Sequence, residues 1–265
     1  MRSNQLFWGV ILLLAGGLML ANEMGIELPN GMSLMELFWP LALMLGGIWV
    51  LIGVFMRGKV EMENASIDLQ GASAASLKIK HGAGELRLHS GANSNELAHG
   101  SFVGGLDQKA ARHADRLEVR MKPAKDVMDF PFLGPRVQLD WDVALNPQVP
   151  IALTLNVGAN KAMLDLRDLN LTDLKMETGA SDTQVTLPAR GRYGADFDLG
   201  AASLAVTVPD GLSARIRASI GAASLAVDEA RFPRNGGYYQ SPDFDTALNA
   251  VDMTIDAGAA SIKIK

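Results

Sequence analysis

The sequence predicts an all-β domain folded as a single-stranded right-handed β-solenoid, preceded by an α-helical transmembrane hairpin of two spans. Two observations predict this architecture. A Gly-Ala pair returns every 21 residues in the second half of the chain, and two long uncharged apolar runs lie near the N-terminus. A fixed period of this length is typical of stacked repeats, because each unit buries its apolar face only against its neighbours.

The Gly-Ala pair keeps strict spacing over four copies and then meets an interruption. A fifth copy follows after a step of 37 residues, so 16 extra residues precede it. The copies stand at Gly158-Ala159, Gly179-Ala180, Gly200-Ala201, Gly221-Ala222 and Gly258-Ala259.

Apolar and polar residues alternate on both sides of each pair. The sixth position after each glycine is apolar in every copy, and the seventh holds Asp, Thr or Lys. A period of two predicts half-buried strands, so each copy reads as strand, Gly-Ala corner and strand. Pro188 to Gly191 and Pro209 to Gly211 predict a second corner. The apolar sixth positions are Leu164, Val185, Val206, Val227 and Ile264.

Parallel stacking explains the columns of small residues better than hairpins do. Small corner residues let successive units approach, and we expect the corner glycines to adopt positive φ. Right-handed coiling follows from the general preference of parallel crossovers. The β-domain should cover residues 60–265, with a less regular stretch over 93–149 and an insertion over 229–247. A sandwich built of hairpins is the alternative.

The N-terminal domain, residues 1–58, is expected to hold the two spans, at about 6–22 and 37–56. Both runs begin Leu-Phe-Trp and carry a Gly-Gly pair, and the second is long enough to cross a hydrocarbon core of about 30 Å. A cleaved signal peptide is the alternative for the first run. The likeness of the two runs favours a helical hairpin.

Charges around the spans predict their orientation. Arg2, Arg57 and Lys59 flank the hairpin, whereas the connecting loop carries three glutamates. The positive-inside rule then places both termini and the β-domain in the cytoplasm, with the lipid bilayer contacted by residues 6–56 of a multi-pass inner-membrane protein. The glycine pairs favour close packing within the hairpin, and homo-oligomers or docking to another membrane protein remain alternatives.

Composition argues against several function classes. The chain has no cysteine, which excludes disulfides and thiol catalysis. A net charge of −5 with 6% aromatic residues is a poor match for nucleic-acid binding. The histidines lack metal-motif spacing, so we expect surface histidines, no metal and no cofactor. They are His81, His89, His99 and His113.

Catalytic signals are equally sparse. No nucleophile elbow, phosphate loop or dinucleotide fingerprint is present. Aspartates are common in the copies, and stacked carboxylates could bind calcium or act on a polysaccharide. Because Asp165, Asp182 and Asp198 do not share one position of the copy, we expect polar surface residues and no enzyme.

The insertion over 229–247 concentrates aromatic residues in a chain that has few. Aromatic side chains and arginine are enriched where proteins bind one another, so four residues are candidate partner contacts. The favoured alternative, which is compatible with that role, is a cap that protects the open end of the stack. The four candidates are Phe232, Tyr238, Tyr239 and Phe244.

With these stretches in view, the chain resembles the membrane-anchored toast-rack proteins of bacteria, which carry a transmembrane region of the LiaI/LiaF type. The resemblance rests on the paired LFW…GG runs with Trp39-Pro40, on WDVALNPQVPIALTLNVGANKAMLDL from Trp141, and on the tail from Gly237. It covers nearly the whole chain. It implies a β-solenoid domain and a non-enzymatic role, which in the best-understood relatives is modulation of envelope-stress signalling.

The leading hypothesis is therefore a membrane-anchored interaction or regulatory scaffold. Its partner would be a protein, for example a membrane signalling protein such as a histidine kinase that responds to envelope damage. An exported adhesin or glycan-binding solenoid is the first alternative, and it needs the opposite topology. A polysaccharide-acting β-helix enzyme is the second.

Overall fold

The structure is a computed structural model that describes residues 9, 11–13, 15–17, 19–20, 23–24, 38–55, 62–124 and 139–265. These residues belong to two compact units. One unit holds the described residues up to Phe55, and the other holds every described strand.

The N-terminal unit is helical where it is described. Helix α2 spans Phe38–Phe55 and contains no charged residue. Pro40 lies in its first turn, where a missing backbone N–H breaks no intrahelical hydrogen bond. The described residues between 9 and 20 are also helical, although much of the expected first span lies outside the described residues. Among the described residues, no helix has both the length and the apolar character needed to cross a membrane.

The second unit is built from strands alone. The longest are β2 and β7, which each run through a corner. The strands are β1 (Met62–Asp68), β2 (Ala74–Ser90), β3 (Glu96–Val103), β4 (Leu106–His113), β5 (Arg116–Pro123), β6 (Trp141–Leu145), β7 (Ile151–Asp165), β8 (Leu171–Thr178), β9 (Asp182–Thr186), β10 (Arg192–Leu199), β11 (Ser203–Thr207), β12 (Ser213–Ile220), β13 (Ser224–Val227), β14 (Arg234–Asn235), β15 (Tyr238–Gln240), β16 (Ala250–Ala257) and β17 (Ser261–Ile264).

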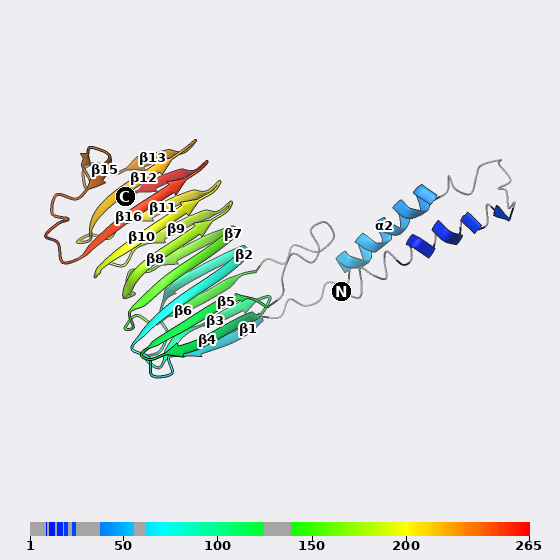
Figure 1. The fold of residues 1–265 in the computed structure, drawn as a ribbon, viewed down its shortest axis with the longest axis horizontal. Helices are drawn as coiled ribbons and strands as arrows, with labels where there is room; N and C mark the ends of the chain where they lie inside the picture. The colour runs from blue at the N-terminus through cyan, green and yellow to red at the C-terminus, as the bar shows by residue number, and fades with distance from the viewer. Residues whose placement is uncertain are drawn as a thin grey trace. The chain divides into compact units, whose positions relative to one another are not determined.

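The strands pair in two ladders that share β2 and β7. The first ladder runs β4, β5, β2, β7, β8, β10, β16, β12, β15, β14. The second runs β1, β3, β6, β2, β7, β9, β11, β17, β13. Figure 1 shows β1, β3, β4 and β5 together at one end of this domain and β12, β13 and β15 at the other.

The expected parallel pairing of the Gly-Ala segments is confirmed. Leu153 pairs with Leu174, and Leu174 pairs with Ala195, so the register advances by one period at each step. Most apolar residues of these segments are buried and belong to one continuous core. Pairing within these segments is parallel, so the hairpin alternative does not describe them.

The last Gly-Ala segment does not lie at the end of the ladders. In the first ladder Met253 of β16 pairs with Ala195 of β10 on one side and with Ile216 of β12 on the other. In the second ladder β17 lies between β11 and β13 in the same way. The Gly258 segment is thus inserted between the Gly200 and Gly221 segments, as the red strand β16 shows in Figure 1. This order leaves the Gly221 segment outermost.

The corner glycines form a column in which each lies against its neighbour's backbone. A Cβ added to Gly158 would lie 2.3 Å from the Gly82 carbonyl oxygen, and one added to Gly200 would lie 2.8 Å from that of Gly179. The expectation of positive φ at these corners is wrong, because positive φ occurs instead at the second corners, at Gly191 and Gly211. Glycine is therefore required in the column because neighbouring backbones approach closely, and not because these residues adopt a positive φ.

The less regular stretch contributes antiparallel strands. β3 pairs with β1 and β6, and β4 forms a hairpin with β5. Trp141 and Phe102 fill the core here, with ring centres 5.0 Å apart. His81 lies beside Trp141 and is 1% exposed, so the expectation of a surface histidine is wrong at this position. The alternation of β2 points its side chain inward, as it does Ile79.

Candidate functional site

The insertion covers the outer edge of β12. Its strand β15 pairs with β12 in antiparallel fashion, with Arg215 opposite Gln240 and Ile216 opposite Tyr239. Strands β14 and β15 form a short hairpin that turns at Gly236, whose φ of 61° favours glycine. An edge strand presents unpaired backbone groups, and the hairpin satisfies part of that edge.

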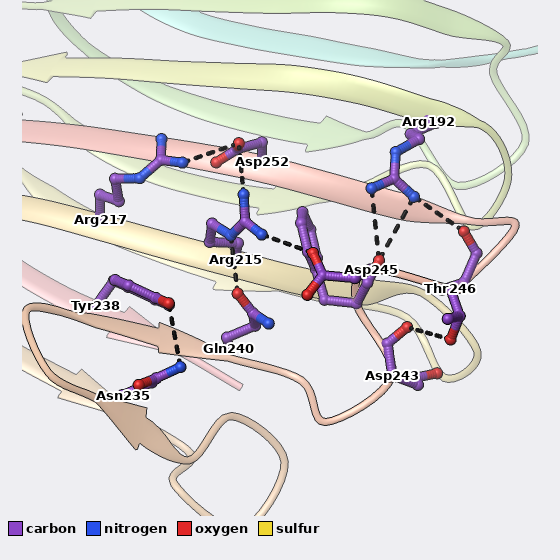
Figure 2. Close-up of polar contacts among 12 residues, drawn as sticks. Arg192, Arg215, Arg217, Asn235, Tyr238, Gln240, Asp243, Asp245, Thr246 and Asp252 are labelled. Carbon is purple, nitrogen blue, oxygen red and sulfur yellow. Dashed lines mark hydrogen bonds and ion pairs between the residues drawn. The ribbon is translucent and has the colours of Figure 1, made fainter.

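Arg215 is the centre of the polar contacts that hold the insertion (Figure 2). Its Nε donates to Gln240 Oε1 at 2.8 Å, and its Nη2 donates to Asp245 Oδ1 at 2.8 Å. Asp252 of the neighbouring strand β16 lies 3.7 Å from Nη1 and also accepts a hydrogen bond from Arg217 at 3.1 Å. The fixed fork of a guanidinium suits several acceptors at once, so Arg215 joins the insertion to two strands.

Phe244 contacts two arginines through its ring. The guanidinium carbon of Arg215 is 4.2 Å from its ring centre, and that of Arg192 is 5.2 Å away. Arg192 Nη1 also donates to the Ala247 carbonyl at 3.0 Å. The ring is 3% exposed. Cation–π attraction strengthens when water is excluded, so these contacts fix the C-terminal half of the insertion.

The N-terminal half is fixed by a second buried ring. Phe232 is 1% exposed and belongs to the main hydrophobic core. The neighbouring Arg231 donates to the Val208 carbonyl at 2.7 Å and to the Pro209 carbonyl at 3.1 Å. The insertion is therefore attached at each end by a buried phenylalanine and by arginine contacts.

The four candidate partner contacts separate into two pairs. Phe232 and Phe244 are buried and hold the insertion, whereas Tyr238 and Tyr239 are half-buried at its rim. Tyr238 accepts a hydrogen bond from Asn235 Nδ2 at 3.1 Å. Pairing and burial thus favour the cap, and partner contact by the two tyrosines stays a prediction.

Among the described strands, the cap pairs with the first ladder. At the end of the second ladder, β13 has a described partner on one side, β17. Leu225 and Val227 are half-buried there, while the matching Leu204 and Val206 of β11 are fully buried. The outer rim of the domain thus combines an arginine-rich cap with a less covered apolar edge.

Sequence reasoning missed Arg215 and a column of carboxylates. Glu177, Asp198 and Asp256 are register neighbours on the first ladder. This column includes a glutamate, so a search among aspartates alone did not reveal it. The three aspartates considered from sequence fall in different columns, since Asp165 pairs with Thr186 and Asp182 with Lys161. Within the described residues, no three His, Cys, Asp or Glu side chains are grouped to hold a metal ion.

A polar hollow of about 550 Å³ lies on the outer face of β1, β3, β6 and β2. Among its lining residues, His89 donates from one ring nitrogen toward the Ser90 carbonyl at 2.8 Å and faces Asp142 Oδ1 with the other at 2.9 Å. Partial burial opposes its protonation, but these two acceptors outweigh it and raise the pKa of His89 above 6.5. The hollow therefore favours an imidazolium beside a carboxylate.

His81 has the opposite behaviour. Burial lowers its pKa below 6.5, against the opposing effects of the Leu139 carbonyl and the Asp140 charge. Its Nε2 donates to Leu139 O at 2.8 Å, which fits a neutral ring. The spacing of the histidines in the sequence did not predict that His81 is buried and His89 is not.

Taken together, the molecule has an apolar N-terminal helix and a β-domain that pairs Gly-Ala segments in register and closes one edge with an insertion. The family model for the N-terminal domain of toast_rack, DUF2154, matches residues 56–207, and the model for the LiaI-LiaF-like transmembrane region matches residues 6–51. The chain belongs to the toast-rack family, and its LiaF-like region anchors it in the membrane. No curated protein matches it.

A solved structure shares the fold of the β-domain. A candidate cell adhesion protein from Clostridium sporogenes ATCC 15579 is 19% identical, with a TM-score of 0.66 over 77% of this chain and 98% of its own. A candidate adhesin from Bacteroides fragilis NCTC 9343 and a candidate lipid-binding protein from Parabacteroides distasonis ATCC 8503 are each 9% identical. They cover 78% of this chain and 98% of their own, with TM-scores of 0.21 and 0.26.

Proposed function

We propose that this protein is a non-enzymatic, membrane-anchored scaffold that binds and regulates a membrane signalling protein in an envelope-stress response. The observation that carries the proposal is the capped rim. Arg215 and two buried phenylalanines hold an aromatic hairpin at the outer end of the domain, with Tyr238 and Tyr239 half-buried. Tyrosine beside arginine is a common composition at the centre of protein interfaces.

The architecture proposed for this role is a right-handed solenoid, in which each Gly-Ala segment contributes one coil. Parallel registers and the glycine column support it. Such a stack is stiff because each coil hydrogen-bonds to the next, even through its corners, where Gly200 N donates to the Thr178 carbonyl at 2.9 Å. A stiff stack presents its rim in one fixed geometry, which reduces the entropy lost on binding.

The proposed topology is a two-span hairpin with both termini and the β-domain in the cytoplasm. Reporter fusions after Lys265 test it in cells. A cytoplasmic reporter should be active there and an exported reporter inactive. An active exported reporter would instead favour the adhesin or glycan-binding role. It would contradict the proposal that the β-domain regulates a signalling protein from the cytoplasm.

Site-specific photocrosslinking in intact membranes tests the partner. A photoreactive residue in place of Tyr238 should give a discrete protein adduct that includes a membrane signalling protein. Lys161, an exposed side chain on the outer face of β7, serves as the matched control. Equal adducts at both positions, or none at Tyr238 under envelope stress, would overturn the assignment of the rim.

A further inference from the structure

A basic surface lies at the other end of the domain, away from the cap. A hollow of about 350 Å³ on the outer face of β2, β4 and β5 is lined by five cationic side chains and one carboxylate. The five cations, called here the basic surface, are Lys78, Lys80, Lys109, Arg120 and Lys122. They are concentrated in a chain whose net charge is −5.

The strand register places like charges directly opposite one another. Arg120 of β5 pairs with Lys109 of β4 on one side and with Lys78 of β2 on the other. Like charges in direct cross-strand positions are destabilising. A bound anion offsets this repulsion, because each of the neighbouring cations attracts it.

Among the described residues, an ion pair compensates one of these five charges. Lys122 pairs with Asp107, with Nζ 3.2 Å from Oδ2. Within the described residues, the other four cations form no ion pair with a carboxylate. The basic surface is therefore open to an external anionic partner.

The chain enters the β-domain beside this surface. Glu63, the second residue of β1, accepts a hydrogen bond from the Leu106 backbone N–H at 2.9 Å. Leu106 directly precedes Asp107, which pairs with Lys122. Only residues 56–61 separate α2 from β1, so the anchored region and this end of the domain are close in sequence.

We propose that the basic surface binds the anionic headgroups of the membrane in which the chain is anchored. Each Lys or Arg near an anionic leaflet contributes about 1 kcal/mol of attraction, so several act together without a shaped pocket. The short tether raises the local concentration of lipid, which lets a surface of modest affinity engage. The proposal holds for either orientation of the anchor and does not depend on the protein partner.

The absence of cysteine allows a direct test on the full chain. Ala111→Cys lies on the same exposed face of β4 as Lys109, and Ala226→Cys lies on β13 at the far end. Each variant carries one fluorescent donor and is reconstituted in nanodiscs that contain headgroup-labelled acceptor lipid. The nanodiscs contain phosphatidylcholine alone or a mixture with phosphatidylglycerol.

Energy transfer from position 111 should rise when phosphatidylglycerol is present and should change little from position 226. Replacing Lys78, Lys109 and Arg120 together by glutamine should weaken the lipid contact about 100-fold. Salt at about 1 M should abolish it, because the Debye length falls to about 3 Å. Thermal unfolding of the triple variant reports whether the domain remains folded.

Two results would overturn the proposal. One is equal energy transfer in neutral and anionic nanodiscs with the wild-type surface. The other is an anionic-lipid response that survives in the folded triple variant. A response to soluble inorganic phosphate or to a phosphopeptide in neutral nanodiscs, without any response to phosphatidylglycerol, would assign the surface to a soluble anion and likewise overturn it.

Discussion

The Arg215 guanidinium lies over the Phe244 ring at the outer rim of the β-domain, with its central carbon 4.2 Å from the ring centre. Arg215 belongs to β12 and Phe244 to the insertion, so their contact joins the outermost segment to its cap. The same guanidinium donates to Gln240 and Asp245, which lie on either side of Phe244 in the insertion. Arg215 thus supplies several of the contacts that hold the proposed partner surface.

Replacing Arg215 by lysine should loosen the insertion while keeping the charge. Lysine cannot donate to Gln240 and Asp245 from a fixed fork, so we expect a loss of about 1–3 kcal/mol of unfolding free energy. Hydrogen exchange over residues 229–247 should accelerate. Arg217→Lys is the matched control, since Arg217 is half exposed and contacts only Asp252 among the described carboxylates. Equal exchange in the two variants would contradict the role given to Arg215.

The glycine column predicts opposite outcomes for two neighbouring corner residues. Gly158→Ala places a Cβ 2.3 Å from the Gly82 carbonyl oxygen, so the backbones must separate at a cost of about 1–3 kcal/mol. Gly82→Ala meets nothing within 4 Å and should be close to neutral. Chemical denaturation of both variants measures the difference. Similar stabilities would show that close approach is not what requires glycine at Gly158.

His81 and His89 predict opposing pH effects on stability. Because the folded pKa of His81 is lowered, the unfolded chain binds its proton first, and stability is lost as pH falls below 6.5. The raised pKa of His89 gives the reverse: its contribution is complete below 6.5 and is lost as pH rises through the folded value. Unfolding free energies measured at pH values below and above 6.5 separate the effects of the two histidines.

The variants for this test keep polar contacts at both sites. His81→Gln can still donate to the Leu139 carbonyl, and it should reduce the loss of stability in acid. His89→Gln should remove the extra stability below pH 6.5. An acid loss of the same size in wild type and His81→Gln would mean that another group causes it.

Much of the β-domain could be predicted from the sequence because local rules determine it. Alternation of apolar residues predicted which faces are buried, and the Gly-Ala period predicted the parallel register. The placement of the last segment could not be predicted, since every segment carries nearly the same pattern and fits several positions in the ladder. The step of 37 residues indicated an insertion but not that Met253 would lie between Ala195 and Ile216.

The candidate site was only partly foreseen for a related reason. Aromatic enrichment located the insertion, but which rings are buried depends on contacts between distant residues. One signal was present in the sequence. Arg215 occupies the position where the Gly179 and Gly258 segments carry Asp173 and Asp252, so the outermost segment reverses the charge of that column. Predicting the basic surface requires the register of β4, β5 and β2. These strands lie outside the part of the chain in which the 21-residue period holds.

The order of the Gly-Ala segments is the central claim, because it decides that β12 and its cap form the outer rim. Disulfide formation between introduced cysteines tests it directly, since the chain has none of its own. Ser261 is the register partner of both Ser203 and Ser224. The pairs Ser203→Cys with Ser261→Cys and Ser224→Cys with Ser261→Cys should each crosslink on oxidation, while Ser203→Cys with Ser224→Cys should not. Efficient crosslinking of the last pair would place the Gly221 segment directly against the Gly200 segment and contradict the account.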